Sequence, residues 1–179
     1  MKIAIVGKMR SGKNTLADYF IGRGFKEFSF RSGIDEVISM FFPAAGEEGK
    51  PRNHYQVIGQ AFRELDPDIW VNRLNTKLWV HEDLFGGGDV VVTDLRQPNE
   101  YFYLNRNDFI VIKVEAAEEL RLERIRAAGD QFDPEALTHE TELEIDHLPF
   151  DYLVTNNGTL QDLYDQAEFI LKELEGEGA

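Results

Sequence analysis

The chain has 179 residues, enough for one domain with a sizeable hydrophobic core or for a core that carries an inserted lobe. Its formal net charge of −14 argues against a polynucleotide partner, because duplex binding depends largely on Lys and Arg that neutralise phosphates. No segment resembles a membrane helix or a signal peptide, so we expect no membrane partner and a cytoplasmic location. The absence of cysteine excludes disulfides and thiolate metal sites.

A glycine-rich loop follows the first apolar run. Residues 3–6 indicate a short buried strand, and Gly7-Lys-Met-Arg-Ser-Gly12-Lys13-Asn14-Thr15 fits the pattern G-x-x-x-x-G-K-[ST] except at Asn14. In such loops the glycines let backbone N–H groups turn toward phosphate oxygens, and the lysine adds a positive charge. A helix predicted directly after the loop would add the anion-binding properties of its N-terminus. The segment therefore predicts a nucleotide-phosphate site.

The loop departs from the usual pattern at Asn14, where Ser or Thr would help to hold Mg²⁺. An amide oxygen can also bind Mg²⁺ or one of its waters, and Thr15 can offer a hydroxyl to a phosphate. We interpret the loop as a functional variant. The residues expected to contact the nucleotide are Gly7, Arg10, Ser11, Gly12, Lys13, Asn14 and Thr15.

A second strand is expected over residues 25–30, followed by a helix that ends before Pro43. Arg31 and Ser32 lie between the two, where open α/β sheets bind ligands, and are candidates for a second anion site. A surface arginine and a helix-capping serine explain them equally well.

Helical periodicity resumes at Tyr55 and continues beyond Asp66-Pro67. Arg63 lies near the end of the first of these helices and could turn into a cleft, or form a salt bridge with a neighbouring acid. Trp70 has a spacing more typical of a core residue than of one that stacks on a base. This helical region is too long for a simple crossover, so residues 33–82 are predicted to form an inserted substrate lobe.

The apolar run Asp89-Val-Val-Val-Thr-Asp94 ends in an acid, as in strands whose carboxylate binds Mg²⁺ beside a phosphate loop. Asp94 is therefore a metal candidate. Arg96 could bind a phosphate bidentately, and a structural ion pair with Glu100 is the alternative.

A further strand, 109–114, leads into a helix that carries Arg121 and Arg124 three residues apart. Phosphoryl-transfer enzymes close such arginines over the transferring group, although a solvated charged face is an equally good explanation. Residues 116–148 are predicted to form a lid, without a metal pattern around His139. A fifth strand over 151–155 and a last helix over 160–174 complete an α/β fold with three layers. We expect a single domain with a parallel sheet of about five strands and helices on both faces.

Four segments together resemble the phage-type deoxynucleoside monophosphate kinases, in the right order and over nearly the whole chain. They are 7–15, Ile58-Gly-Gln-Ala-Phe-Arg63 with Asp66-Pro-Asp-Ile-Trp70, Val92-Thr-Asp-Leu-Arg-Gln-Pro-Asn-Glu100, and Asp151-Tyr-Leu-Val-Thr-Asn-Asn-Gly-Thr-Leu160. The resemblance implies a P-loop kinase fold and transfer of the ATP γ-phosphoryl group to the 5′-phosphate of a deoxynucleotide. ATP, Mg²⁺ and a deoxynucleoside monophosphate would be its small-molecule partners, in the host cytoplasm if a phage encodes the protein. That family often has Asp at the position of Asn14.

The resemblance also implies roles for the candidate residues. Lys13 would hold the β/γ-phosphates, Asn14 and Asp94 the surroundings of Mg²⁺, and Thr15 the α-phosphate. Because the acceptor phosphate is already an anion, no general base is needed and catalysis is positioning plus charge stabilisation. The residues with implied catalytic roles are Lys13, Asp94, Arg96, Arg121 and Arg124. Those with implied roles in acceptor binding are Arg31, Ser32, Arg63, Trp70 and Arg96.

Two other interpretations stay open. A kinase similar to dephospho-coenzyme A kinase would share the fold and lid but would need a larger acceptor pocket. A nucleotide-binding module without transfer would bind ATP and leave every acceptor unchanged, and its GTPase form is disfavoured because the chain has no Asn-Lys-x-Asp motif. The acceptor base and the oligomeric state, a homodimer included, are left open.

Overall fold

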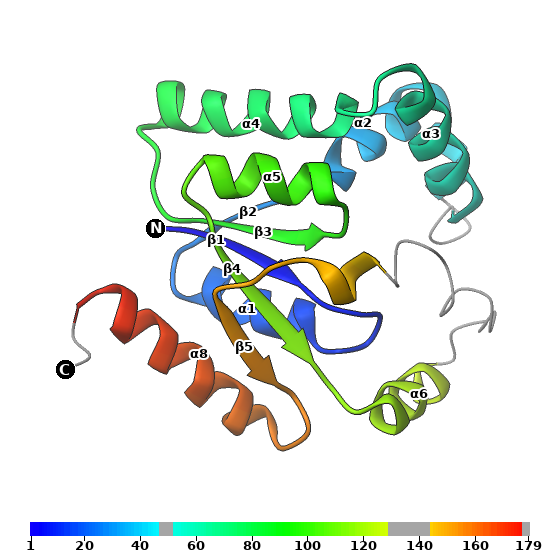
Figure 1. Cartoon of the computed structure of the whole chain (residues 1–179). Coiled ribbons are helices and arrows are strands. Elements are labelled where there is room, and N and C mark those ends of the chain that lie inside the picture. The colour runs from blue at the N-terminus through cyan, green and yellow to red at the C-terminus, as the bar shows by residue number, and fades with distance from the viewer. Residues whose placement is uncertain (47–51, 129–143, 177–179) are drawn as a thin grey trace. The chain divides into compact units, whose positions relative to one another are not determined.

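A computed structural model describes residues 1–46, 52–128 and 144–176 (Figure 1). The chain divides into two compact units. One consists of Met1–Glu27 and Asp89–Ala179, and the other of Phe28–Gly88. No helix of the described residues is long and apolar enough to cross a membrane.

Five strands form one sheet in the order β2-β3-β1-β4-β5. Their bounds are β1 (Lys2–Val6), β2 (Lys26–Phe28), β3 (Val90–Leu95), β4 (Ile110–Glu115) and β5 (Tyr152–Thr155). β1 pairs in parallel with both β3 and β4, and β4 pairs in parallel with β5. The chain continues from β1 toward β2 on one side of the sheet and from β4 toward β5 on the other side. The carboxyl ends of β1 and β4 therefore form the switch point at which open α/β sheets bind ligands.

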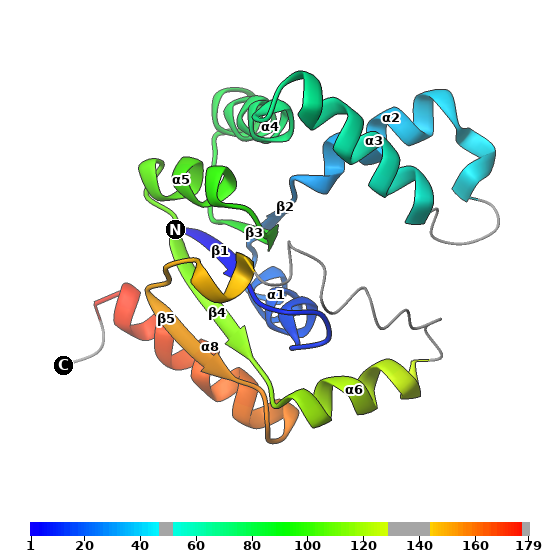
Figure 2. The ribbon, with the colours of Figure 1, turned by 45° about the vertical axis from the view of Figure 1, so that its right-hand side comes forward.

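The central strands are runs of buried aliphatic residues, as expected for parallel strands that are covered on both faces. In β1, residues Ile3 to Val6 are fully buried. Helices α1 (Lys13–Gly22) and α8 (Leu160–Leu174) pack together on one face of the sheet, and α5 (Pro98–Arg106) lies on the other (Figures 1 and 2). The expected three-layer α/β fold is confirmed.

Two short segments complete the first unit. Helix α6 (Glu118–Ala127) follows β4 and extends beyond its carboxyl end (Figure 2), and a 3₁₀ turn, η3 (Ile145–His147), precedes β5. Residues 129–143, most of the predicted lid and including His139, lie outside the described residues.

Helix α5 was not anticipated from the sequence. Gln97 caps it, Pro98 occupies its first turn, and Glu100 completes a capping box. The Glu100 carboxylate is 3% exposed and accepts hydrogen bonds from the backbone N–H groups of Arg96 (2.8 Å) and Gln97 (3.0 Å). Glu100 therefore starts a helix at the carboxyl end of β3.

The second unit is helical. It contains α2 (Arg31–Phe41), the 3₁₀ turn η1 (Pro43–Gly46), α3 (Arg52–Leu65) and α4 (Ile69–Phe85). The α-helices pack against one another, and their shared core includes Ile34, Ile58 and Leu74. Strand β2 ends at Phe28, two residues earlier than predicted, because Phe30 already has helical backbone angles as the N-cap of α2.

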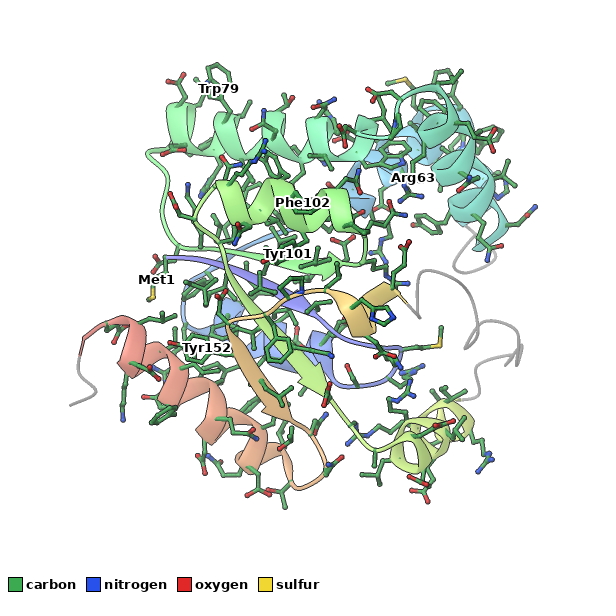
Figure 3. The ribbon with its side chains drawn as sticks, in the orientation of Figure 1. Met1, Arg63, Trp79, Tyr101, Phe102 and Tyr152 are labelled. Atoms are coloured by element: carbon green, nitrogen blue, oxygen red, sulfur yellow. The ribbon has the colours of Figure 1, made fainter. Side chains whose placement is uncertain are left out.

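Trp70 lies in the core of this unit, with 4% of its surface exposed. Its indole N–H donates to the carbonyl of Gly59 (3.2 Å), and its ring stacks on Phe62 with 5.4 Å between centroids. By contrast Trp79, on the apolar pattern of the same helix, is 59% exposed (Figure 3).

Candidate active site

The loop between β1 and α1 has the backbone of a phosphate-binding loop. Gly12 caps α1 with a φ of 108°, a conformation that L side chains rarely adopt. A Cβ at Gly12 would overlap the side-chain amide of Asn156, and one at Gly7 would overlap the carbonyl oxygen of Val114. Both glycines are therefore required by close approach of neighbouring groups.

Lys13 lies over the loop that precedes it. Its side chain is nearly buried, and its ammonium group donates to the carbonyls of Gly7 (2.5 Å) and Lys8 (2.9 Å). The positive charge is thus held at the centre of the loop. Asn14 and Thr15 follow in the first turn of α1, Asn14 exposed and Thr15 half-buried.

Two arginines of α6 reach the outer side of the same loop. Arg121 donates to the carbonyl of Met9 (3.3 Å), and Arg124 donates to the carbonyl of Arg10 (3.3 Å). Arg121 is 9% exposed. These contacts distinguish the pair from a merely solvated helix face, because they place both side chains at the loop.

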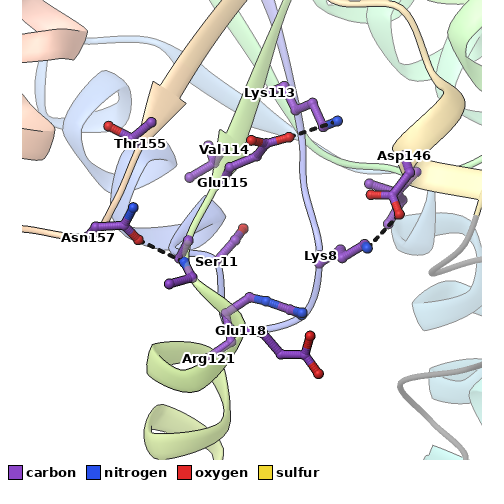
Figure 4. A pocket seen from close by; sticks show the side chains of 13 residues that line it. Lys8, Ser11, Lys113, Val114, Glu115, Glu118, Arg121, Asp146, Thr155 and Asn157 are labelled. Atoms are coloured by element: carbon purple, nitrogen blue, oxygen red, sulfur yellow. Dashed lines mark hydrogen bonds and ion pairs between the residues drawn. The ribbon is translucent and has the colours of Figure 1, made fainter.

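A cavity of about 330 Å³ opens beside the loop at the carboxyl ends of β1 and β4 (Figure 4). Two ion pairs border it, Lys8 with Asp146 (2.6 Å) and Lys113 with Glu115 (2.9 Å). Ser11 also lines it, and its hydroxyl is buried without a hydrogen-bond partner among the described residues. The volume lies at the lower end of the range of about 300–1,000 Å³ that is typical of small-molecule pockets.

Asp94 is the penultimate residue of β3, and the register pairs its neighbour Leu95 with Val6 at the end of β1. Asp94 therefore lies at the carboxyl ends of the strands, where the phosphate loop also begins. Arg96 follows directly. The carboxylate of Glu100 accepts a hydrogen bond from the backbone N–H of Arg96, so Glu100 acts here as part of the helix cap described above.

The described residues include no group of three or more His, Asp or Glu side chains that could enclose a metal ion. Mg²⁺ does not need such a cage, because it usually keeps several waters and binds one or two protein groups together with substrate phosphates. The exposed amide of Asn14 and the carboxylate of Asp94 carry oxygen atoms of the kind that Mg²⁺ binds.

The remaining candidates belong to the second unit. Arg31 lies 3.5 Å from the Asp35 carboxylate and over the ring of Tyr55, 5.6 Å from its centroid. The Tyr55 hydroxyl donates to Asp35, and this hydrogen bond together with burial raises the pKa of Tyr55. Ser32, in the first turn of α2, donates to the carbonyl of Ser29, which precedes the helix (2.6 Å).

Arg63 lies in the last turn of α3 and is half-buried (Figure 3), while Trp70 is the core residue of this unit described above. The first unit thus holds the loop, Asp94, Arg96 and the two α6 arginines. Arg31, Ser32, Arg63 and Trp70 belong to the helical unit.

Asn156 contacts the loop but was not singled out from the sequence. Asn156 follows β5, is 8% exposed, and donates its side-chain N–H to the carbonyl of Ser11 (2.8 Å). The reasoning that selected Asp94, a polar residue at the carboxyl end of a strand, applies equally to Asn156.

No family model matches the chain. An uncharacterized protein, ORF76, of Ictalurid herpesvirus 1 (strain Auburn) is 32% identical over 108 residues, which are 57% of this chain and 42% of the viral protein. The chain thus spans less than half the length of that curated relative.

Solved structures resemble almost the full chain. TT1252 from Thermus thermophilus superposes with a TM-score of 0.63 and 22% identity, covering 97% of both chains. Dephospho-CoA kinase from Campylobacter jejuni gives 0.58 and 14%, covering 99% of this chain and 100% of the kinase. Shikimate kinase from Aquifex aeolicus gives 0.52 and 19%, covering 99% and 98%. The chain therefore has the fold of the P-loop kinases: a five-stranded parallel sheet with helices on both faces and a phosphate loop after β1.

Proposed function

We propose that the protein is a small-molecule kinase that transfers the γ-phosphoryl group of ATP to the 5′-phosphate of a deoxynucleoside monophosphate. The observation that carries this proposal is the convergence of three cationic side chains on one loop. Lys13 contacts the loop from within, and Arg121 and Arg124 contact it from α6. A site that must offset the charge of a transferring phosphoryl group needs such a concentration of donors.

On the donor side, the N–H groups of the loop and of the first turn of α1 would bind the phosphates of ATP. Lys13 would leave its two loop carbonyls and bind the β/γ-phosphates, and Thr15 would bind the α-phosphate. Mg²⁺, when bound, neutralises phosphate charge, and Asn14 and Asp94 would hold it, directly or through water.

On the acceptor side, Arg96 would bind the 5′-phosphate, with Arg31 and Arg63 as further phosphate or base contacts. Ser32 and Trp70 would support this lobe. Arg121 and Arg124 would shift from the loop carbonyls toward the transferring group. The residues 116–148 would act as the lid. Support for a nucleotide acceptor comes from the resemblance of four sequence segments to the phage-type deoxynucleoside monophosphate kinases, and the number of arginines suits an acceptor that is itself a phosphate.

The test is release of ADP from Mg-ATP, measured by a coupled assay against dAMP, dGMP, dCMP, dTMP and the corresponding ribonucleotides. Lys13→Ala should abolish acceptor-dependent release, since the charge at the β/γ position is lost. Lys172→Ala, on the exposed side of α8, should leave the rate unchanged. Equal rates in Lys13→Ala and the unmodified protein would contradict the proposal.

A second candidate is favoured by the structural similarity to dephospho-CoA kinase. Dephospho-CoA belongs in the same acceptor screen, together with shikimate. ADP release with one of these acceptors and none with any nucleoside monophosphate would replace the proposed substrate while retaining a kinase. ATP binding without release for any acceptor would instead indicate a non-catalytic nucleotide-binding module.

A further inference from the structure

All five carbonyl groups from Gly7 to Ser11 accept hydrogen bonds from side chains. The first two face Lys13, as described above. The next three face outward, and each has a different donor: Met9 accepts from Arg121, Arg10 from Arg124, and Ser11 from Asn156. The outer side of the phosphate loop is therefore held at three successive peptide groups.

The orientation of a carbonyl fixes the orientation of the next N–H, because the two point in opposite directions across a planar trans peptide. When the Ser11 carbonyl points outward to Asn156, the N–H of Gly12 points to the inner side of the loop. In a loop of this kind the inner side is where phosphate oxygens bind. Asn156 thus influences the direction of the Gly12 N–H, a phosphate-binding donor that Asn156 does not itself contact.

Asn156 connects the loop to two other elements. Its backbone N–H donates to the carbonyl of Glu115 at the end of β4 (2.7 Å), and its own carbonyl accepts from Arg124 (2.9 Å). The residue is 8% exposed, and its amide fills the space that a side chain at Gly12 would need. Its backbone is thus fixed by a hydrogen bond to β4, while its side chain is hydrogen-bonded to the loop.

We propose that Asn156 is a positioning residue of the phosphate loop: its amide keeps the Ser11 carbonyl outward and so aims the Gly12 N–H at a bound phosphate. The inference rests on the proposed binding of nucleotide phosphates by this loop. It assigns Asn156 a role in phosphate binding, and none in recognition of the base.

The decisive variant is Asn156→Asp. It keeps the size of the side chain and both backbone contacts, but a carboxylate has no N–H to donate and would repel the Ser11 carbonyl. Asn156→Ala removes the hydrogen bond without adding a charge and carries the same test if the Asn156→Asp variant does not fold. Asn105→Asp makes the same chemical change on the exposed side of α5 and serves as the matched control.

Two probes separate loop positioning from contact with the nucleoside: ADP, and inorganic tripolyphosphate, which has no base or ribose. Calorimetric titration of each folded variant should show about tenfold weaker binding of both probes in Asn156→Asp, and a smaller loss in Asn156→Ala. Asn105→Asp should bind both probes as the unmodified protein does. A loss confined to ADP would mean that Asn156 contacts the nucleoside, and would overturn the inference.

The pH dependence adds a readout that a purely structural role would not change. The carboxyl group introduced by Asn156→Asp can again donate to the Ser11 carbonyl once it is protonated. The affinity ratio between the unmodified protein and Asn156→Asp should therefore narrow as the pH falls from about 7 to about 5. If this affinity ratio does not change with pH, or if Asn156→Asp binds both probes as tightly as the unmodified protein, the inference about Asn156 is wrong. Either result leaves the proposed function untouched. Failure of the unmodified protein to bind either probe would overturn the proposed function and this inference with it.

Discussion

The ammonium group of Lys8 lies 2.6 Å from the carboxylate of Asp146, so a residue of the phosphate loop is paired with a residue of η3 that is 138 positions later in the chain. Both side chains are partly exposed, at 31% and 44%. Exposed pairs of this kind stabilise proteins by about 0–1 kcal/mol, so the pair contributes little to folding. Its main effect is electrostatic, because it places a carboxylate beside a loop that is proposed to bind polyanions.

Asp146→Asn should therefore strengthen ADP binding by about two- to fivefold at low salt, since it removes a negative charge and leaves Lys8 available to the phosphates. The gain should shrink as the salt concentration rises, because exposed charges are screened. Calorimetric titration at two ionic strengths measures both effects. Weaker binding in Asp146→Asn would mean that the carboxylate itself supports the nucleotide site.

Gly12→Ala should abolish nucleotide binding and lower stability, because it adds a Cβ that overlaps Asn156 to a backbone with a φ of 108°. Gly24→Ala is the matched control: its φ is 98°, and a Cβ there meets nothing within 4 Å. Gly24→Ala should therefore show only the cost of the strained backbone, about 1–3 kcal/mol, with ADP affinity unchanged. Chemical denaturation and ADP titration of both variants give the comparison. If Gly12→Ala and Gly24→Ala lose the same amount of stability, close packing against Asn156 is not the reason why position 12 requires glycine.

Glu100→Gln should destabilise the protein by about 1–3 kcal/mol, because the buried carboxylate accepts two backbone hydrogen bonds at the start of α5. Both N–H groups donate to the same oxygen, Oε2, so Gln would replace a charged acceptor with the weaker, neutral oxygen of an amide. Glu64→Gln, at an exposed position near the end of α3, should change stability by less than about 0.5 kcal/mol. Urea denaturation curves test the difference, and equal midpoints for the two variants would show that the cap is not required.

The stability of the first unit should also depend on pH through Tyr19. Burial and the hydrogen bond from its hydroxyl to Glu168 raise the pKa of Tyr19 from 10.0 to about 12. Because the folded-state pKa lies above the unfolded value, this stabilisation is fully present below about pH 10 and is lost as the pH rises through about 12. Tyr19→Phe should be less stable than the unmodified protein at pH 8, and the difference should fade by about pH 12. A difference that does not vary with pH would contradict this account, and Tyr101→Phe serves as the control.

The fold was largely predictable because its central strands carry a local signal. Buried aliphatic runs marked β1, β3 and β4, and the glycines and lysine of the loop marked the turn into α1. Helix α5 was missed although Gln97, Pro98 and Glu100 form a recognisable start, because Glu100 was interpreted only as a possible ion-pair partner of Arg96. The end of β2 was misplaced because Phe30 continues an apolar alternation in sequence but begins a helix in space.

The candidate site was predictable only where its residues are close in sequence. Gly12 and Lys13 belong to one loop, and spacing alone identifies them. Asn156 meets Ser11 across 145 residues, and that contact depends on the strand order, which sequence periodicity does not contain. The α6 arginines were selected for their chemistry, but their contacts with the loop carbonyls likewise follow from the placement of β4 beside β1.

The confinement of Lys13 has a practical consequence for chemical modification. The ammonium group of Lys13 donates to two carbonyls, and the residue is only 8% exposed, so an acylating reagent in solution reaches it slowly. Exposed lysines such as Lys26 and Lys172 would react first with an amine-reactive dye or resin. The protein can thus be labelled or attached to a surface through its amines while the lysine of the phosphate loop stays unmodified.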